Sequence, residues 1–277
     1  MILAQITDSH LLLPTDEHPA AGDRLDNLRA AVNRINAIEG GVDAVIHTGD
    51  MAHNHLPEEY ALALEILSEL TAPLYVVPGN RDSRRNLRHA FGGGYMDGNG
   101  DAPILYAIDT HAVRLVAFDS QSGRKQDTGD QGHQRKGDLD KQRLDWLDST
   151  LAAAPDTPTA IFMHHPPVPI ETSTYPWQWL RDEAGDELAS VVSRHPQVLR
   201  LFCGHSHRAY MSDLAGVRVS TQPSIAVDLR LGEFAPEMQD RPVFQVHQFA
   251  DGDFSSEMLI ADTSAARHPH RSSTAAE

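Results

Sequence analysis

The sequence predicts an α/β protein with a parallel sheet, because strand patterns and helix patterns alternate over its first eighty residues. Short apolar runs rich in β-branched residues, typical of buried strands, occupy 2–7, 42–46 and 74–77. Between them, 23–38 and 57–70 carry apolar residues at three- and four-residue spacing, as amphipathic helices do. This strand–helix–strand–helix–strand order predicts parallel strands joined by right-handed crossovers.

The remaining chain predicts further strands, with fewer helices between them. Expected strands cover 104–108, 114–118, 159–163, 198–202, 208–214, 217–221, 244–249 and 257–260, and expected helices cover 139–151 and 183–194. Residues 121–137 are polar and charged and predict a mobile loop near a site. We expect one domain over 1–262 and a disordered tail over 263–277, where the sequence becomes simple and polar.

Composition and charge exclude several classes of protein. A chain of 277 residues that is 40% hydrophobic can bury a large core. Its formal charge of -16 argues against a nucleic-acid polymer as partner, because such binding depends on basic residues that neutralise phosphates. The sequence has no signal-peptide pattern and no long apolar stretch, and Cys203 is its single cysteine. We therefore expect a cytoplasmic protein without membrane insertion or an intrachain disulfide.

Side chains that bind metals follow five of the predicted strands. These positions are Asp8 and His10, Asp50, Asn80, the pair His164 and His165, and the pair His205 and His207. Ligands of open α/β sheets bind at the carboxyl ends of strands, so these side chains are expected to converge. In extended backbone, residues two apart point to the same face, so Asp8 and His10 can hold one ion together.

The number of candidate ligands predicts two metal ions. One ion would be held by Asp8, His10 and His207, and a second by Asn80, His205 and one histidine of the pair 164–165, with Asp50 bridging. Seven ligands exceed a tetrahedral site but suit two ions about 3.5–4 Å apart. Asp, Asn and His ligands suit zinc, manganese or iron. Two divalent ions would leave the pocket positive, which favours a phosphate and lowers the pKa of a bridging water.

The five clusters, in this order, resemble the calcineurin-like metallophosphoesterases over residues 2 to about 221. Three segments are most similar to bacterial class III cyclic nucleotide phosphodiesterases and their glycerophosphodiesterase relatives: Ile6-Thr7-Asp8-Ser9-His10, Phe162-Met163-His164-His165-Pro166-Pro167 and Phe202-Cys203-Gly204-His205-Ser206-His207. The resemblance implies a four-layer α/β/β/α sandwich and attack on phosphorus by hydroxide bound to two divalent or trivalent ions (Mn, Fe or Zn). It also implies that His164 is the ligand rather than His165, and that the protein forms a homodimer or larger homo-oligomer.

One position departs from the family pattern. The family usually has Gly-Asn-His-Asp, whereas this chain has Gly79-Asn80-Arg81-Asp82. Arginine can bind phosphate oxygens but cannot release a proton near neutral pH, so Arg81 is expected to bind substrate without acting as the acid. His53 and His165 are further candidates for substrate binding, and His53 or a water is a candidate proton donor. Alternatively, Arg81 turns away to pair with Asp82.

These observations predict a phosphodiesterase that acts on a small diester, either a cyclic nucleotide or a glycerophosphodiester. A phosphomonoesterase acting on a nucleotide or another small phosphate ester is the alternative within the same fold. A non-catalytic scaffold is disfavoured because all seven ligand positions are filled. Without an acid at position 81, aryl diesters and strained 2′,3′-cyclic nucleotides are expected to react faster than 3′,5′-cyclic nucleotides or simple alkyl diesters.

Overall fold

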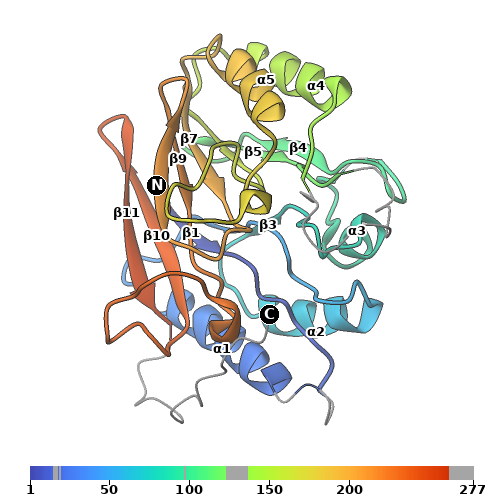
Figure 1. The fold of residues 1–277 in the computed structure, drawn as a ribbon, viewed down its shortest axis with the longest axis vertical. Coiled ribbons are helices and arrows are strands. Elements are labelled where there is room, and N and C mark those ends of the chain that lie inside the picture. Colours follow the sequence, from blue (N-terminus) through green and yellow to red (C-terminus); the bar gives the residue numbers. More distant parts are fainter. Residues whose placement is uncertain (15–17, 19, 97, 123–136, 262–277) are drawn as a thin grey trace.

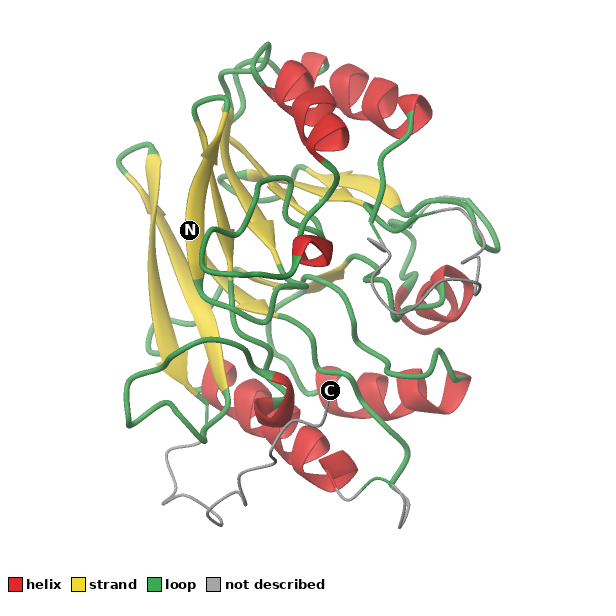
Figure 2. Cartoon of the chain, in the orientation of Figure 1, coloured by secondary structure: helices red, strands yellow, loops and turns green. Residues whose placement is uncertain are grey.

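The computed structural model describes residues 1–14, 18, 20–96, 98–122 and 137–261. It has two mixed sheets with helices on their outer faces (Figures 1 and 2). The predicted tail over 263–277 and most of the predicted loop over 121–137 lie outside the described residues. Among the helices that the structure describes, none is both long enough and apolar enough to span a membrane.

The first sheet has the strand order β11-β10-β1-β2-β3. Its strands are β1 (Ile2–Ile6), β2 (Ala44–His47), β3 (Leu74–Val76), β10 (Val243–Ala250) and β11 (Asp253–Ile260). The three N-terminal strands are parallel, as predicted, whereas β10 is antiparallel to β1 and forms a hairpin with β11. The crossovers contain α1 (Ala20–Asn36) and α2 (Pro57–Leu67). The first strand of the chain therefore lies in the middle of its sheet.

The second sheet has the order β4-β5-β6-β7-β9-β8. Its strands are β4 (Leu105–Ile108), β5 (Arg114–Phe118), β6 (Thr159–Phe162), β7 (Val198–Cys203), β8 (Tyr210–Leu214) and β9 (Val217–Thr221). Strands β5, β6, β7 and β9 run parallel. Helices α4 (Lys141–Ala152) and α5 (Asp182–Val192) lie together on one side of the molecule, and α1 and α2 lie on the other (Figure 1).

The side chains of the second sheet pack on both of its faces. Phe162 and Phe202 belong to the core shared with the first sheet, whereas Ile161 and Leu201 belong to the core shared with α4 and α5. Successive residues of a strand point to opposite faces, which explains why these neighbours enter different cores. The layers are thus helix, sheet, sheet and helix, and the predicted four-layer α/β/β/α sandwich is confirmed.

Two local features differ from the sequence-based expectation. Helix α3 (Arg84–Phe91) was not expected, because few of its residues are apolar; Ser83 caps it by accepting a hydrogen bond from the Asn86 N–H. Helix α1 begins at Ala20, three residues before the expected start at residue 23, so Asp23 lies in its first turn. An acidic side chain in the first turn still stabilises the helix through its dipole.

Candidate metal centre

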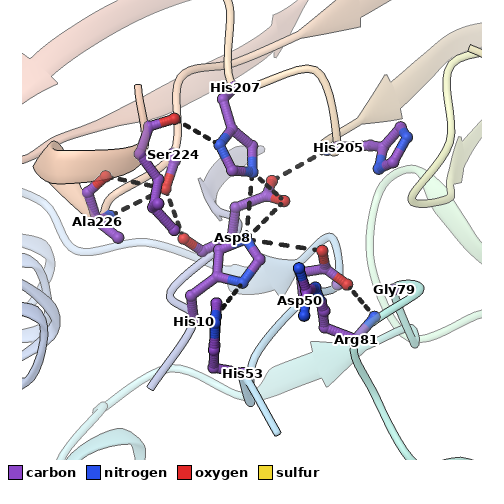
Figure 3. A network of polar contacts seen from close by, with 12 residues as sticks. Asp8, His10, Asp50, His53, Gly79, Arg81, His205, His207, Ser224 and Ala226 are labelled. Atoms are coloured by element: carbon purple, nitrogen blue, oxygen red, sulfur yellow. Dashed lines mark hydrogen bonds and ion pairs between the residues drawn. The ribbon is translucent and has the colours of Figure 1, made fainter. Parts of the chain in front are cut away.

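The loops after five strands bring the predicted ligands to one place at the carboxyl ends of these strands. Figure 3 shows Asp8, His10, Asp50, His205 and His207. The first sheet contributes Asp8, His10, Asp50 and Asn80, and the second contributes His164, His205 and His207. All seven side chains come from loops at the carboxyl ends of strands, where the parallel strand order predicts a ligand site. Six of these residues are buried, and His207 is half-buried.

Asp8, His10 and His207 form one group that can hold an ion. The Nε2 atom of His207 lies 3.1 Å from Asp8 Oδ1 and 3.2 Å from His10 Nε2. On the other side of its ring, His207 Nδ1 donates to the Leu229 carbonyl at 2.7 Å. This hydrogen bond places the proton of the neutral ring on Nδ1, so Nε2 is available as a ligand.

Asp50 lies between this group and a second one. Its Oδ2 is 3.6 Å from His10 Nε2 and 3.5 Å from His164 Nε2, while its Oδ1 accepts the Arg81 backbone N–H at 2.6 Å. His164 Nδ1 donates to the Thr48 carbonyl at 2.7 Å, which leaves His164 Nε2 free to face Asp50. A carboxylate in this position can bridge two ions.

The second group contains buried polar atoms that need a partner. Asn80 Oδ1 and His164 Nε2 are buried without a hydrogen bond among the described residues. His205 Nε2 donates to the Trp177 carbonyl at 2.9 Å, which leaves its Nδ1 as the available ligand atom. Buried polar atoms are almost always satisfied, so orphaned acceptors of metal-binding type fit a bound cation. The chemistry of these residues therefore fits the two-metal centre that the family implies.

The neighbouring histidines 164 and 165 differ in their surroundings. His164 faces Asp50, whereas His165 Nδ1 is 2.9 Å from Ser120 Oγ and its ring lies against His205. His165 Nε2 is also buried without a partner, and these three histidines form a further group with ligand-forming geometry. The distance to Asp50 favours His164 as the ligand and leaves His165 beside it.

Five of the seven predicted ligands have left-handed backbone. The φ angles are +51° at Asp8, +44° at His10, +53° at Asp50, +65° at His205 and +53° at His207. Residues other than glycine seldom adopt this conformation, and strained backbone clusters at functional sites. The strain supports a binding function for these loops rather than an ordinary turn.

Two glycines allow the loops to approach this closely. A Cβ at Gly79 would collide with the Asp50 carboxylate, and a Cβ at Gly204 would lie 2.7 Å from Asp8 Oδ2. Any side chain at either position would displace a predicted ligand.

Burial and the charges of Asp8 and Asp50 shift the pKa values of the ligand histidines in two directions. Burial alone would lower the pKa of His164, but the charge of Asp50 raises it to about 9. Burial likewise opposes the charge of Asp8 at His207, and the pKa of His207 is raised. At His205 burial prevails and lowers the pKa to about 3, and it also lowers that of His10. Without metal, the protonated form is therefore favoured more than usual at His164 and His207, and less than usual at His205 and His10.

The carboxylates remain ionised in spite of their burial. Burial would raise the pKa of Asp8, but the adjacent His207 lowers it to about 2. Burial also opposes ionisation of Asp50, and His164 lowers its pKa well below the ordinary value. Two fixed negative charges in a buried site favour cations.

The alternative pairing of Arg81 with Asp82 is wrong. The Asp82 carboxylate accepts hydrogen bonds from other groups: the backbone N–H groups of Met51, Ala52 and Gly79, and the Tyr60 hydroxyl. Among the described residues, no ion pair joins Arg81 to Asp82. The Asp82 carboxylate instead holds the loops after β2 and β3 together.

His53 lies next to the ligands, with its Nδ1 3.4 Å from His10 Nδ1 (Figure 3). Burial, and next the positive charge of Arg81, lowers the pKa of His53 to about 4. His53 is therefore not an imidazolium at neutral pH, which weakens it as the proton donor.

Sequence reasoning missed an ion pair that supports His10. Arg24 on α1 donates to the His10 carbonyl at 2.9 Å and pairs with Asp228 at 2.6 Å. Nothing in the local pattern marks either residue, because one lies within a helix and its partner is 204 positions away.

Comparison with known proteins identifies the family. A profile described as calcineurin-like phosphoesterase matches residues 1–209. The chain belongs to this family. It is 34% identical to the glycerophosphodiester phosphodiesterase GpdQ of Enterobacter lignolyticus over 81% of this chain and 77% of that protein. It is 28% identical to the 3′,5′-cyclic adenosine monophosphate phosphodiesterase CpdA of Escherichia coli K12 over 94% of this chain and 90% of that protein.

Solved structures agree on the fold. A dimetal phosphatase from Danio rerio has a TM-score of 0.69 at 19% identity, covering 95% of this chain and 96% of that chain. The GAP50 protein of Plasmodium has a TM-score of 0.63 at 13% identity, covering 98% and 88%. The predicted membership of the calcineurin-like superfamily is confirmed, and the names of the relatives agree with the predicted metal-dependent phosphodiesterase.

Proposed function

We propose that this protein is a phosphodiesterase that hydrolyses a small phosphodiester at a centre for two metal ions. The observation that carries the proposal is the position of Asp50. Its carboxylate lies about equally far from His10 and His164, at 3.6 and 3.5 Å, and each histidine belongs to a different ligand group. A shared carboxylate between two ligand groups is the arrangement that a two-metal hydrolase needs.

Each ion has its own set of residues. Asp8, His10 and His207 would hold the first ion, and Asn80, His164 and His205 the second, with Asp50 shared. Bound ions would polarise the phosphoryl oxygens and activate a water molecule.

The chain's own groups orient the ligands and bind the substrate. The Arg81 N–H fixes Asp50 Oδ1, and the Thr48 and Leu229 carbonyls fix the rings of His164 and His207. The guanidinium of Arg81 would donate hydrogen bonds to phosphate oxygens, which it can do at any physiological pH. His53 and His165 border the ligands and would contact the substrate.

A small diester is favoured over a polymer and over a monoester. The relatives GpdQ and CpdA are named for glycerophosphodiesters and for cyclic adenosine monophosphate. The formal charge of -16 would repel a nucleic-acid polymer from most of the surface. We further propose a cytoplasmic homo-oligomer containing Mn, Fe or Zn; chromatography with light scattering would measure its size, and elemental analysis its metals.

A substrate panel tests the proposal. Bis(p-nitrophenyl) phosphate, p-nitrophenyl phosphate, glycerophosphodiesters, and 2′,3′- and 3′,5′-cyclic nucleotides would be assayed with Mn²⁺, Fe²⁺ or Zn²⁺. We expect the diesters to exceed the monoester in kcat/KM, and His164→Gln to remove most of the activity. His195→Gln is the matched control, because His195 pairs with Asp148 away from the metal centre. Faster hydrolysis of the monoester would support the phosphomonoesterase alternative, and loss of activity in the control would show damage unrelated to the metals.

A further inference from the structure

A chain of polar side chains runs between the two sheets, from the C-terminal hairpin to the loops of the metal centre. Gln5 on β1 and His247 on β10 are both fully buried. Gln5 Oε1 lies 3.0 Å from His247 Nε2, and His247 Nδ1 lies 2.7 Å from Ser256 Oγ on β11. Arg200 on β7, in the second sheet, donates to the same Ser256 oxygen at 3.2 Å. The hydrogen bonds thus connect strands of both sheets.

The neighbours of Gln5 determine which way its amide points. Its Nε2 is 3.0 Å from the Cys203 carbonyl and 3.0 Å from Thr48 Oγ1. A carbonyl oxygen can only accept a hydrogen bond, so the NH₂ group must face Cys203. The amide oxygen must therefore face His247.

The same reasoning determines the tautomer of His247. Gln5 Oε1 only accepts, so His247 Nε2 must carry the ring proton. His247 Nδ1 then accepts from the Ser256 hydroxyl, which accepts from Arg200 in turn. Burial, followed by the charge of Arg200, lowers the pKa of His247 to about 3, so the ring is neutral. In each hydrogen bond from Arg200 through Ser256, His247 and Gln5 to the Cys203 carbonyl, the donor and the acceptor are therefore fixed.

The inner end of this chain reaches the segments that carry the metal ligands. Thr48 precedes Asp50 by two residues, and Cys203 precedes His205 by two. The Thr48 carbonyl also accepts the hydrogen bond that orients His164. One buried amide, that of Gln5, therefore joins the ends of β2 and β7, which belong to different sheets.

We propose that Gln5 and His247 are positioning residues for the metal centre, and that the β10–β11 hairpin controls metal affinity through them. Gln5 ties the Asp50 loop to the His205 loop, and His247 holds the Gln5 amide in the orientation that this requires. The hairpin lies outside residues 1–209, which match the family profile. The inference rests on the metal centre proposed above and assigns it support from a distant part of the chain.

The first test is the tautomer, which needs no bound metal. Proton–nitrogen correlation spectra of the metal-free protein, labelled with ¹⁵N-histidine, report which ring nitrogen of each histidine carries hydrogen. His247→Gln would identify the His247 signal by its disappearance. We expect the Nε2–H form of His247 at neutral pH. The Nδ1–H form, or a protonated ring, would overturn the inference. This test uses the wild-type ring, so it does not depend on the folding of the His247→Leu variant used below.

The second test measures metal affinity by competition with a chelator, using Mn²⁺ and Zn²⁺ separately. We expect His247→Leu to weaken binding about tenfold, the lower part of the range for residues that orient metal ligands. His247→Gln should stay within about twofold of wild type, because its amide can donate to Gln5 and accept from Ser256. Phe254→Leu is the control, because Phe254 is buried on the same hairpin and packs against Phe202 without joining the chain.

The control separates positioning from general stability. We expect Phe254→Leu to lower the melting temperature of the metal-free protein while metal affinity stays within about twofold of wild type. Equal loss of metal affinity in His247→Leu and Phe254→Leu would overturn the inference. If the wild type binds metal and His247→Leu binds it with an affinity within twofold of wild type, the inference is overturned as well. A wild type that binds no metal would overturn the proposed metal centre as well, a result that is easily told apart from the others.

Discussion

The two sheets supply different kinds of candidate ligand to the proposed metal centre. The first sheet provides both carboxylates, the amide of Asn80 and one histidine, whereas the second sheet provides three histidines and no acidic ligand. The negative charge that would neutralise bound ions therefore comes from one side of the centre. Ligands from the other side are imidazoles, which must give up or lack a proton before they bind. The negative charge thus comes from the first sheet, whereas three of the four histidines, for which protons compete with metal, come from the second sheet.

The sheets also differ in how their ligands are oriented. Each histidine of the second sheet uses one ring nitrogen to donate to a backbone carbonyl: His164 to Thr48, His205 to Trp177 and His207 to Leu229. The Asp50 and Asp8 carboxylates instead accept backbone N–H groups, from Arg81 and His205 respectively. Because the Thr48 carbonyl belongs to a loop of the first sheet, the orientation of His164 depends on both layers.

Removal of the Asp50 carboxylate, the proposed bridge, is expected to have the largest effect, because ligands from both sheets would lose their ions. Asp50→Asn should lower activity on the order of 10³-fold or more, because the residue contacts both ligand groups. Elemental analysis should show that both ions are lost. Asp148→Asn, at the surface beside His195, is the control and should retain both. Two ions per chain in Asp50→Asn would refute the bridge.

Loss of a second-sheet histidine should have a smaller and more selective effect. His207→Gln should weaken the binding of one ion by about 10- to 100-fold while the other ion remains, because the His207 ring contacts Asp8 and His10, with which it forms one ligand group. Titration with a chelator, followed by metal analysis, would resolve the two ions. Simultaneous release of both ions would show that the two groups are not separate.

The pH dependence should distinguish the metal-free from the metal-bound protein. The pKa of His164 is about 9, against an ordinary value of 6.5. Protonation of His164 therefore stabilises the metal-free fold, and this contribution is fully present below pH 6.5 and is lost as the pH rises to about 9. The melting temperature of the metal-free protein should therefore fall by several degrees across this interval. Metal affinity should rise over the same interval, because fewer protons compete.

Differential scanning fluorimetry of metal-free protein between pH 6 and 9.5 would measure this trend. The metal-free His164→Gln variant lacks the titrating ring and should show a flatter profile. A wild-type profile as flat as that of the variant would mean that His164 is not protonated in the absence of metal.

The smallest expected effect concerns Arg81, a cation that comes from the first sheet beside the Asp50 carboxylate. Arg81→His should raise the rate of hydrolysis of diesters with poor leaving groups. The ratio of the rate on aryl diesters to the rate on these diesters should fall by about tenfold. This is below the 10²- to 10⁴-fold typical of a well-placed general acid, because the new imidazole would not be optimally positioned. Rates on bis(p-nitrophenyl) phosphate and an alkyl diester would measure the gap. Equal slowing of both substrates would show that Arg81 only binds phosphate.

The sequence was most informative where function depends on local pattern. Asp8, Asp50 and Asn80 each follow a short apolar run, and parallel strands bring such ends together, so their convergence could be predicted without coordinates. Family membership and the sandwich fold followed from the order of these clusters. Helix α3 escaped prediction because Leu87 and Phe91 are its only large apolar residues, which gives too little periodicity.

The supporting contacts could not be predicted, because they join residues that are remote in the chain. Gln5 and His247 are 242 positions apart, and Arg24 and Asp228 are 204 apart. A glutamine in a strand and an arginine in a helix are ordinary in their local settings. Only the folded structure brings these distant residues together: Gln5 meets His247 between neighbouring strands, and Arg24 on α1 meets Asp228.

The central position of β1 has a consequence for synthesis of the protein. One edge of β1 pairs with β2, but its other edge pairs with β10, which begins at Val243, 237 residues (243 − 6) after β1 ends at Ile6. At about 5–20 residues per second, a ribosome needs roughly ten to fifty seconds to deliver that partner. Throughout this time the nascent chain carries an unpaired apolar strand edge, which invites pairing with other chains. Premature termination shortly before Val243 would leave that edge permanently open, so such fragments should require a chaperone or be removed by proteases.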